Sequence, residues 1–270
     1  LIEDRAGRFE RAEKLASDAL SRCPAGADRD EARWQRALAL HHLGRRPEAL
    51  REYERVAEGA VLPQMRLGAP EAAAVLSERN GDFANAIRHY FALEYRLDYA
   101  YAIDCLAAPD DLRGFLRRFP AHPRANLVRY SLGFRQLRAG EYEAAADTLA
   151  SLGKWLDVAE KAYAAETSKG AKRTPPLKVA RFLADAKRRE AAARTPAERA
   201  RIAYDAARFI FHQRHLAFYN GALWKGSRTF AFDLNPAYNI ENPDAELTES
   251  EQSARARHQE EHAALRQALK

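Results

Sequence analysis

The chain has few cysteines, few turn-forming residues and no long apolar run. Its 270 residues include 2 Cys, 13 Gly and 12 Pro. Cys23 and Cys105 stand far apart and in no metal-ligand spacing, which excludes a zinc ribbon and a dense disulfide framework. So few turn residues argue against a many-stranded sandwich or barrel. No window approaches eighteen consecutive apolar residues, so the sequence predicts no membrane span. The remaining expectation is a helical protein.

The charge is only mildly basic, with 44 Lys and Arg against 38 Asp and Glu and a formal net charge of +6. Most arginines alternate with acidic residues, as in Arg51-Glu52-Tyr53-Glu54-Arg55, which is typical of solvated helix faces. One basic cluster, residues 169–173 together with residues 187–189, is interpreted as a solvated loop and helix end. The sequence therefore predicts no nucleic-acid partner. A signal peptide removed before residue 1 would leave no trace, so the compartment stays open.

Motifs that would force a reaction class are absent, including a Gly-rich phosphate loop and a Gly-x-Ser-x-Gly elbow. The segment His258-Gln259-Glu260-Glu261-His262 matches the zinc-protease pattern His-x-x-Glu-His. Such a site needs a downstream carboxylate ligand, and residues 263–270 contain none. We interpret the pair as part of a polar helix face and predict no metal, no cofactor and no catalytic residue. A metal-dependent hydrolase using His258, Glu261 and His262 is one alternative.

One pattern occurs four times along the first half of the chain. It consists of a glycine, an aromatic residue two positions later and an alanine three positions after that, with Arg46 in place of the aromatic in the second copy. The four glycines are Gly7, Gly44, Gly81 and Gly140. An amphipathic helix precedes the later copies, with apolar residues three and four positions apart. The pattern predicts helical hairpins, because glycine permits a left-handed turn after the first helix and alanine lets two helices approach closely.

These copies resemble the tetratricopeptide repeat, in the form found in bacterial proteins, which has Leu-Gly early, an alanine in the middle and an aromatic four residues later. The best copy contains Leu132-Gly133, Gly140, Tyr142, Ala145 and Leu149, the last in place of the second aromatic. The resemblance covers residues 1–155, although residues 95–116 match no repeat register. It implies an all-α, right-handed superhelical solenoid of helix-turn-helix repeats.

Residues 156–270 are expected to add further helix pairs to the same solenoid. Helices are predicted over residues 155–166 and 177–193, and Thr195-Pro196-Ala197-Glu198 forms a capping box that opens another to residue 219. A long non-helical loop is expected over residues 220–247, followed by a terminal helix over residues 249–270. Asp104, Asp110 and Asp111 are interpreted as caps of a helix that starts near Asp111.

Aromatic residues are dense between residues 204 and 238, where nine occur. An exposed apolar stretch of that size would aggregate. We therefore expect the loop to be ordered and to fold back so that its rings are buried against the solenoid. An aromatic docking surface for a peptide or another subunit is the alternative.

The resemblance implies a non-catalytic scaffold that binds a protein or peptide on the concave face of the solenoid. In the family's register, the groove-facing residues of the second copy are Trp34, Leu38 and His41, and those of the fourth are Tyr130, Phe134 and Arg138. The Lys, Asn and Arg set with which some family members grip a C-terminal carboxylate is lacking. An accessory helical domain of a larger enzyme, or a purely structural subunit, are the further alternatives. The sequence does not identify the oligomeric state.

Overall fold

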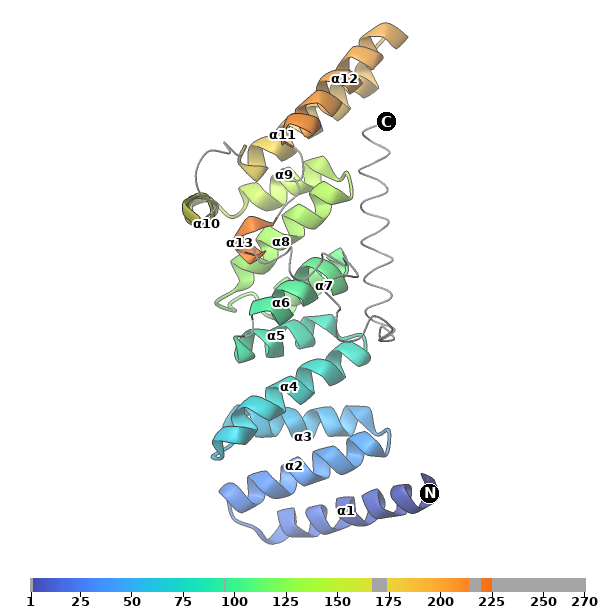
Figure 1. Cartoon of the computed structure of the whole chain (residues 1–270), viewed down its shortest axis with the longest axis vertical. Coiled ribbons are helices and arrows are strands. Elements are labelled where there is room, and N and C mark those ends of the chain that lie inside the picture. Colours follow the sequence, from blue (N-terminus) through green and yellow to red (C-terminus); the bar gives the residue numbers. More distant parts are fainter. Residues whose placement is uncertain (1, 95, 167–173, 214–219, 225–270) are drawn as a thin grey trace, which may run out of the picture. The chain divides into compact units, whose positions relative to one another are not determined.

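The structure is a computed structural model, and it describes residues 2–94, 96–166, 174–213 and 220–224 (Figure 1). Every regular element in these ranges is a helix, so the predicted all-α class is confirmed there. No helix in them is both long and apolar enough to cross a membrane. The chain divides into two compact units, residues 1–95 and residues 96–270. The predicted end of the repeat-like region, at residue 155, falls within the second unit, and that division remains a prediction.

The first unit is a row of helices in which each helix packs on the next one along the chain (Figure 1). The helices are α1 (Ile2–Arg22), α2 (Ala27–His42), α3 (Arg46–Gly59), α4 (Pro63–Arg79) and α5 (Phe83–Leu93). Their amphipathic faces meet in small apolar clusters between neighbours. One cluster joins Leu40 of α2, Tyr53 of α3 and Leu76 of α4, all of them fully buried. Stability in this unit therefore comes from contacts between helices that are close in sequence.

Three inter-helix turns, at Gly44, Gly81 and Gly140, share one geometry. The three glycines have φ angles of 74°, 75° and 74°. In each turn the residue after the glycine donates its N–H to a carbonyl five residues earlier, the Schellman arrangement that satisfies the last carbonyls of a helix. The three pairs are Arg45 with Leu40, Asp82 with Ser77 and Glu141 with Gln136, each at 2.9 Å. The predicted left-handed glycine turn is confirmed at these three positions.

The same three hairpins bury a small residue at matching places in both helices. Seven residues before each glycine stand Ala37, Ala74 and Gly133, and five residues after it stand Ala49, Ala86 and Ala145; all six are buried. In the third hairpin a Cβ built on Gly133 would lie 2.7 Å from the side chain of Leu149. A larger residue at that place would therefore push the two helices apart.

The prediction of a turn at Gly7 is wrong. Gly7 lies inside α1, which continues without a break from Ile2 to Arg22. A single glycine in a helix costs only about 1 kcal/mol relative to alanine. That cost does not end the helix at this position, and α1 continues to Arg22.

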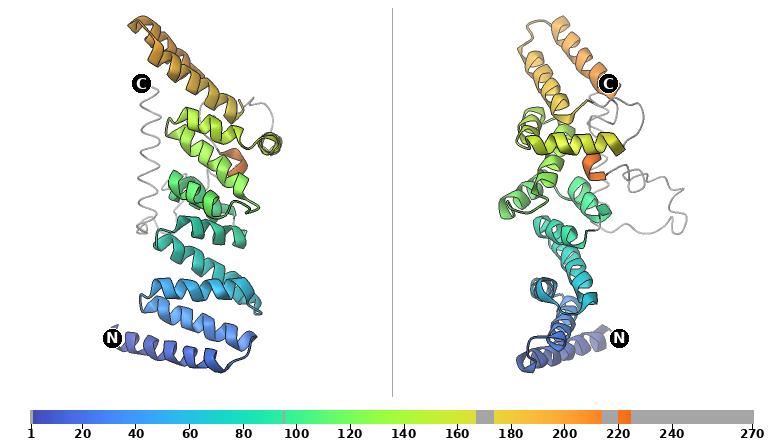
Figure 2. Two further views of the ribbon diagram at one scale, coloured as in Figure 1. Left: turned by 180° about the vertical axis from the view of Figure 1, so that it is seen from behind. Right: turned by 90° about the vertical axis from the view of Figure 1, so that its left-hand side faces the viewer.

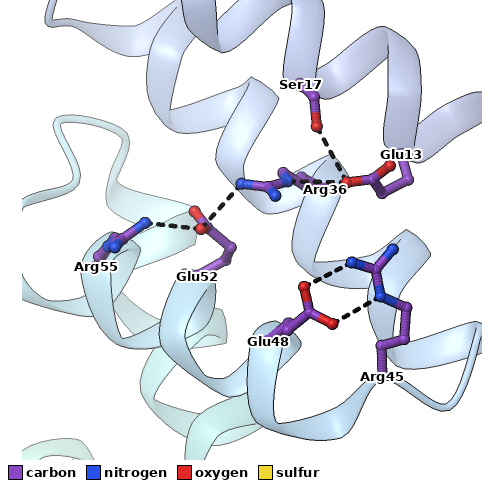
Figure 3. Close-up of polar contacts among 7 residues, drawn as sticks. All are labelled: Glu13, Ser17, Arg36, Arg45, Glu48, Glu52 and Arg55. Carbon is purple, nitrogen blue, oxygen red and sulfur yellow. Dashed lines mark hydrogen bonds and ion pairs between the residues drawn. The ribbon is translucent and has the colours of Figure 1, made fainter.

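Charged side chains link the first three helices (Figure 3). Arg36 of α2 lies between two acids, with its guanidinium 3.2 Å from Glu13 of α1 and 3.2 Å from Glu52 of α3. Arg55 also contacts Glu52, at 2.8 Å. At the Gly44 turn, Arg45 donates two hydrogen bonds to Glu48, at 2.7 and 2.6 Å. Some of the charged residues that the sequence predicted on solvated faces therefore form ion pairs between neighbouring helices and help to align them.

The second unit is less regular than the first. It contains α6 (Arg96–Tyr101), η1 (Ala102–Leu106), α7 (Pro109–Arg118), α8 (Ala125–Arg138), α9 (Tyr142–Ala150), α10 (Lys154–Glu166), α11 (Pro176–Ala192), α12 (Pro196–Gln213) and α13 (Gly221–Trp224). The element η1 is a turn of π-helix, with the N–H of Ala107 donating to the carbonyl of Ala102 at 2.8 Å. It lies in the segment that matched no repeat register.

Most of the helices expected in this unit are present. The helices predicted at residues 155–166 and 177–193 correspond to α10 and α11. The predicted cap of α12 is also found, with the N–H of Glu198 donating to Thr195 Oγ1 at 3.1 Å. The expected non-helical loop from residue 220 is wrong at its start, because Gly221–Trp224 form a helical turn. The predicted helix at residues 249–270 lies outside the described residues.

Candidate functional site

The predicted groove residues of the second repeat copy form a row along α2. Trp34, Leu38 and His41 are four and three positions apart, and each is half-buried. The Trp34 ring meets Tyr53 of α3 edge-on, with 5.4 Å between ring centroids. On its other side the ring lies against the backbone of α4, where a Cβ on Gly68 would be 3.2 Å from it. The row is therefore held in place by α3 and α4 while part of each side chain stays in solvent.

The His41 end of this row is electropositive. Partial burial lowers the pKa of His41, and the nearby guanidinium groups of Arg79 and Arg46 lower it further. The imidazole is therefore neutral near pH 7, while the exposed arginines Arg46 and Arg79 stay charged. The α2 row thus runs from an aromatic end at Trp34 to a basic end at His41.

The predicted groove residues of the fourth copy are core residues instead. Tyr130 and Phe134 are fully buried, in a cluster that also contains Leu156 of α10 and Val179 of α11. The Tyr130 hydroxyl donates to Glu160 of α10. The register placed these rings on an open face, but Tyr130 meets Trp155 of α10, and residues of α9, α10 and α11 form one apolar cluster with both rings. The assignment of Tyr130 and Phe134 to a ligand groove is therefore wrong.

Arg138, the last predicted groove residue, is also buried, and it binds an acid of the same unit. Its guanidinium makes a two-pronged ion pair with Asp104 of η1, with distances of 2.7 and 3.1 Å. Both side chains are almost completely removed from solvent. The sequence indicated that Asp104 is a helix cap. This prediction is wrong, because the Asp104 carboxylate is paired with Arg138. Of the three acids interpreted as caps, Asp111 accepts the N–H of Ala108 at 2.7 Å, while Asp110 pairs with Arg113.

Asp104 is the centre of a buried polar site that joins three elements. Arg135 of α8 donates to its backbone carbonyl. The indole Nε1 of Trp224 donates to Asp104 Oδ2 at 2.7 Å, across 120 positions of sequence. Asn220 donates to Ser131 Oγ at 2.9 Å, and both of these side chains are fully buried. We call this set the Asp104 site; it consists of Asp104, Ser131, Arg135, Arg138, Asn220 and Trp224.

Sequence reasoning did not find the Asp104 site, because its members were interpreted separately. The one available signal was the segment around residues 95–116, which breaks the repeat register. A π-helical turn is rare and often occurs at functional sites, and this one positions Asp104. The prediction that the aromatic rings of residues 204–238 are buried is confirmed for Trp224, which is fully buried, and is wrong for Tyr204 and Phe211, which are 64% and 63% exposed. The residues of the aromatic loop after 224 lie outside the described part of the chain.

A second polar cluster connects α3 with α5 in the first unit. Glu54 Oε1 accepts from Asn85 Nδ2 at 2.8 Å and from Arg88 at 3.0 Å, and it lies 3.3 Å from His89 Nε2. Asn85 also donates to Ser77 Oγ at 3.0 Å. The hydrogen bond with His89 contributes most to lowering the pKa of Glu54, to about 2. Glu54 is therefore ionised throughout the neutral range and ties the two helices together.

Within the described residues, the histidines do not assemble a metal site. His42 stacks on Phe9 with ring centroids 4.2 Å apart, while His41 meets Tyr53. Across residues 2–94, 96–166, 174–213 and 220–224, no group of three His, Cys, Asp or Glu side chains is placed to hold a metal ion. His258, Glu261 and His262 lie outside these ranges, as does the basic segment 169–173.

The chain matches no protein-family model, no curated protein and no solved structure. Its function must therefore be argued from its own residues.

Proposed function

We propose that the chain is a non-catalytic scaffold that binds a protein or peptide on the concave face of a tetratricopeptide-like helical solenoid. Three features support the repeat architecture: the identical turns at Gly44, Gly81 and Gly140, the matching buried small residues, and the packing of each helix in the first unit on its neighbours. Arrays of this kind present extended surfaces without needing covalent chemistry.

The observation that carries the proposal is the α2 row. Trp34, Leu38 and His41 stay partly exposed although they lie between large core residues. Partly buried tryptophans in well-packed surroundings are typical binding anchors, because they offer a large contact area at a small entropic cost. The close approach of Gly68 fixes the Trp34 ring before any partner binds. A preorganised ring loses less freedom on binding.

The chemistry of the row favours a peptide that combines apolar and acidic side chains. An apolar side chain fits over Trp34 and Leu38. A carboxylate fits at the other end, where Arg46 and Arg79 are exposed and their charge already acts on His41. The proposed partner is therefore a peptide with an acidic group a few residues from an apolar anchor.

A peptide-library selection on the full chain tests this function. The selected peptides should contain acidic and apolar residues, and their affinities are then measured by fluorescence anisotropy. We expect Trp34→Ala to weaken binding by at least about tenfold, as for a central anchor. Arg79→Glu changes only an exposed side chain, so it should weaken binding while leaving the fold intact.

Tyr204→Ala is the matched control, because Tyr204 is a large exposed residue on α12, far along the sequence from the α2 row. Its affinity for the selected peptides should equal that of the wild-type chain. The proposal fails if the library gives no peptide above background, or if Trp34→Ala and Arg79→Glu bind as tightly as Tyr204→Ala.

A further inference from the structure

The short helix α13 is seated in the second unit as a folded peptide would be seated in a receptor. It lies against α8 and α10 (Figure 2) and also contacts α6. Asn220, Leu223 and Trp224 have 0–1 % of their surface exposed. Their polar partners Ser131 and Asp104 are 89 and 120 positions away in sequence. Residues 220–224 are therefore buried against elements that lie far from them in the sequence.

The contact is made through the two ends of a single helical turn. Asn220 caps the turn with its side-chain oxygen, which accepts the N–H of Leu223 at 3.2 Å. Its amide nitrogen is then directed to Ser131. At the other end, the Trp224 indole reaches the carboxylate of Asp104. The segment is thus recognised by an amide, an indole N–H and an apolar side chain, in the order Asn-x-x-Leu-Trp.

The receiving side of the Asp104 site is held in place without α13. Asp104 keeps its two-pronged pair with Arg138 and the contact of its carbonyl with Arg135. Ser131 donates its own hydroxyl to Leu127 in the same helix, at 2.9 Å. The carboxylate therefore stays neutralised by a buried guanidinium if the indole leaves. A site that stays charge-balanced when empty can exchange its occupant at a much smaller cost than one that would expose an unpaired buried ion.

The π-helical turn gives the site its acceptor. In η1 the backbone hydrogen bond spans five residues instead of the four of an α-helix, and the five residues of η1 are all buried. Asp104 lies in the middle of this turn and contacts α8 through Arg138 and α13 through Trp224. The irregular turn thus supplies the acceptor for the indole, while Ser131 of α8 supplies the acceptor for the asparagine.

We propose that the Asp104 site is a peptide-docking site and that residues Asn220–Trp224 are its tethered ligand, which can be replaced in trans by a peptide that presents the same asparagine, leucine and tryptophan. This site uses other residues than the α2 row and does not rest on the function proposed above. The tethered segment holds the site closed until a competing segment of the same chemistry displaces it.

The test uses a full-length variant in which the tethered ligand is weakened, Asn220→Ala combined with Trp224→Ala. The probe is a fluorescent synthetic peptide with the sequence of residues 219–226, and binding is followed by anisotropy. We expect saturable binding to the double variant, and at least about tenfold weaker binding to the wild-type chain, where the tethered segment competes.

Two matched changes check that binding uses the observed contacts. Replacing the tryptophan of the peptide by phenylalanine keeps an aromatic side chain but removes the donor to Asp104, which should weaken binding by at least about tenfold for a hydrogen bond to a charged group. Adding Ser131→Ala to the double variant removes the acceptor for the peptide's asparagine and should weaken binding severalfold. Circular dichroism of each variant reports whether the helices are retained.

Every outcome of this experiment either supports or overturns the proposed docking site. If the double variant loses its helical signal and the peptide restores it, the segment acts in trans and the proposal holds. If the helical signal is lost and the peptide does not restore it, α13 is an inseparable part of the core and the proposal is overturned. A folded double variant without saturable binding, or binding that is insensitive to both matched changes, overturns it as well.

Discussion

Ala145 shows how strongly a single small residue controls the packing of a hairpin. It is fully buried on α9, where that helix meets α8, and the same interface leaves no room for a Cβ on Gly133. We expect Ala145→Trp to lower the free energy of unfolding by about 1 to 3 kcal/mol, because over-packing a tight core forces helices apart. Urea unfolding followed by circular dichroism measures the change.

The neighbouring residue Ala144 provides the control, since it is exposed on the same helix. Ala144→Trp should change the free energy of unfolding by no more than about 0.5 kcal/mol. Equal losses for the two variants would mean that helix propensity, and not packing against α8, accounts for the effect at position 145.

Glu54 makes the stability of the first unit depend on pH in the acidic range. Its pKa falls from 4.5 to about 2 in the folded protein, chiefly through the hydrogen bond with His89. A lowered carboxyl pKa contributes stability above pH 4.5, and this contribution is lost as the pH falls from 4.5 towards 2. One pKa unit corresponds to about 1.4 kcal/mol, so the contribution of Glu54 to the free energy of unfolding is at most about 3 kcal/mol. Solvent screening reduces this contribution, because a quarter of the Glu54 side chain is exposed.

Glu54→Gln should therefore flatten the dependence of stability on pH between pH 4.5 and 2, measured by thermal unfolding across that range. Glu58→Gln changes an exposed acid of the same helix and should leave the slope of the wild-type chain unchanged. A wild-type slope in the Glu54→Gln variant would show that other carboxyl groups cause the acid sensitivity.

At the scale of elements, the three Schellman turns make a prediction that compares equivalent positions. Gly44, Gly81 and Gly140 have positive φ angles, and no atom lies within 4 Å of an added Cβ at any of them. Changing each to alanine should therefore cost about 1 to 2 kcal/mol from backbone conformation alone, with nearly equal values at the three sites. Urea unfolding of the three variants measures the costs.

Gly7→Ala is the contrasting change, because Gly7 lies inside α1 with open space around it. Alanine there should stabilise the chain by about 0.5 to 1 kcal/mol. A loss at Gly7, or strongly unequal losses at the three turns, would contradict the common turn geometry.

The elements that could be predicted from sequence are those fixed by local chemistry. The glycine predicted to end a helix does so at Gly44, Gly81 and Gly140, although the same pattern at Gly7 forms no turn, and Thr195 with Glu198 caps the start of α12. The Asp104 site depends instead on a π-helical turn and on a segment 120 residues away. No local pattern encodes such a contact, so Arg138 was assigned to an open face.

The same distinction explains why half of the predicted groove residues are core residues. The repeat register describes one hairpin and its neighbours, and Trp34, Leu38 and His41 stay half-buried on α2, so their assignment to a groove remains a prediction. Around Tyr130 and Phe134, by contrast, residues of α9, α10 and α11 form one apolar cluster with the rings, which the register does not contain. Burial by helices later in the chain cannot be deduced from the spacing of apolar residues in α8 alone.

At the scale of the whole molecule, the two units are stabilised by different means. In the first unit, packing and ion pairs link neighbouring helices, as with Arg36 between Glu13 and Glu52. In the second unit, the Asp104 site joins segments far apart in sequence. Each unit has its own apolar clusters. Units with separate cores often unfold in separate transitions.

We therefore predict that damage to one core lowers the stability of that unit only. Leu40 and Leu137 are fully buried, in the first and the second unit respectively, and each Leu→Ala change should cost about 2 to 5 kcal/mol. The three tryptophans of the chain allow the units to be followed separately, because Trp34 belongs to the first unit and Trp155 and Trp224 to the second. In a Trp34→Phe background the fluorescence reports the second unit, and in a Trp155→Phe, Trp224→Phe background it reports the first. Leu40→Ala should shift the urea midpoint only in the Trp155→Phe, Trp224→Phe background, which reports the first unit. Leu137→Ala should shift it only in the Trp34→Phe background, which reports the second unit. Equal shifts in both backgrounds would show that the chain unfolds as one cooperative body.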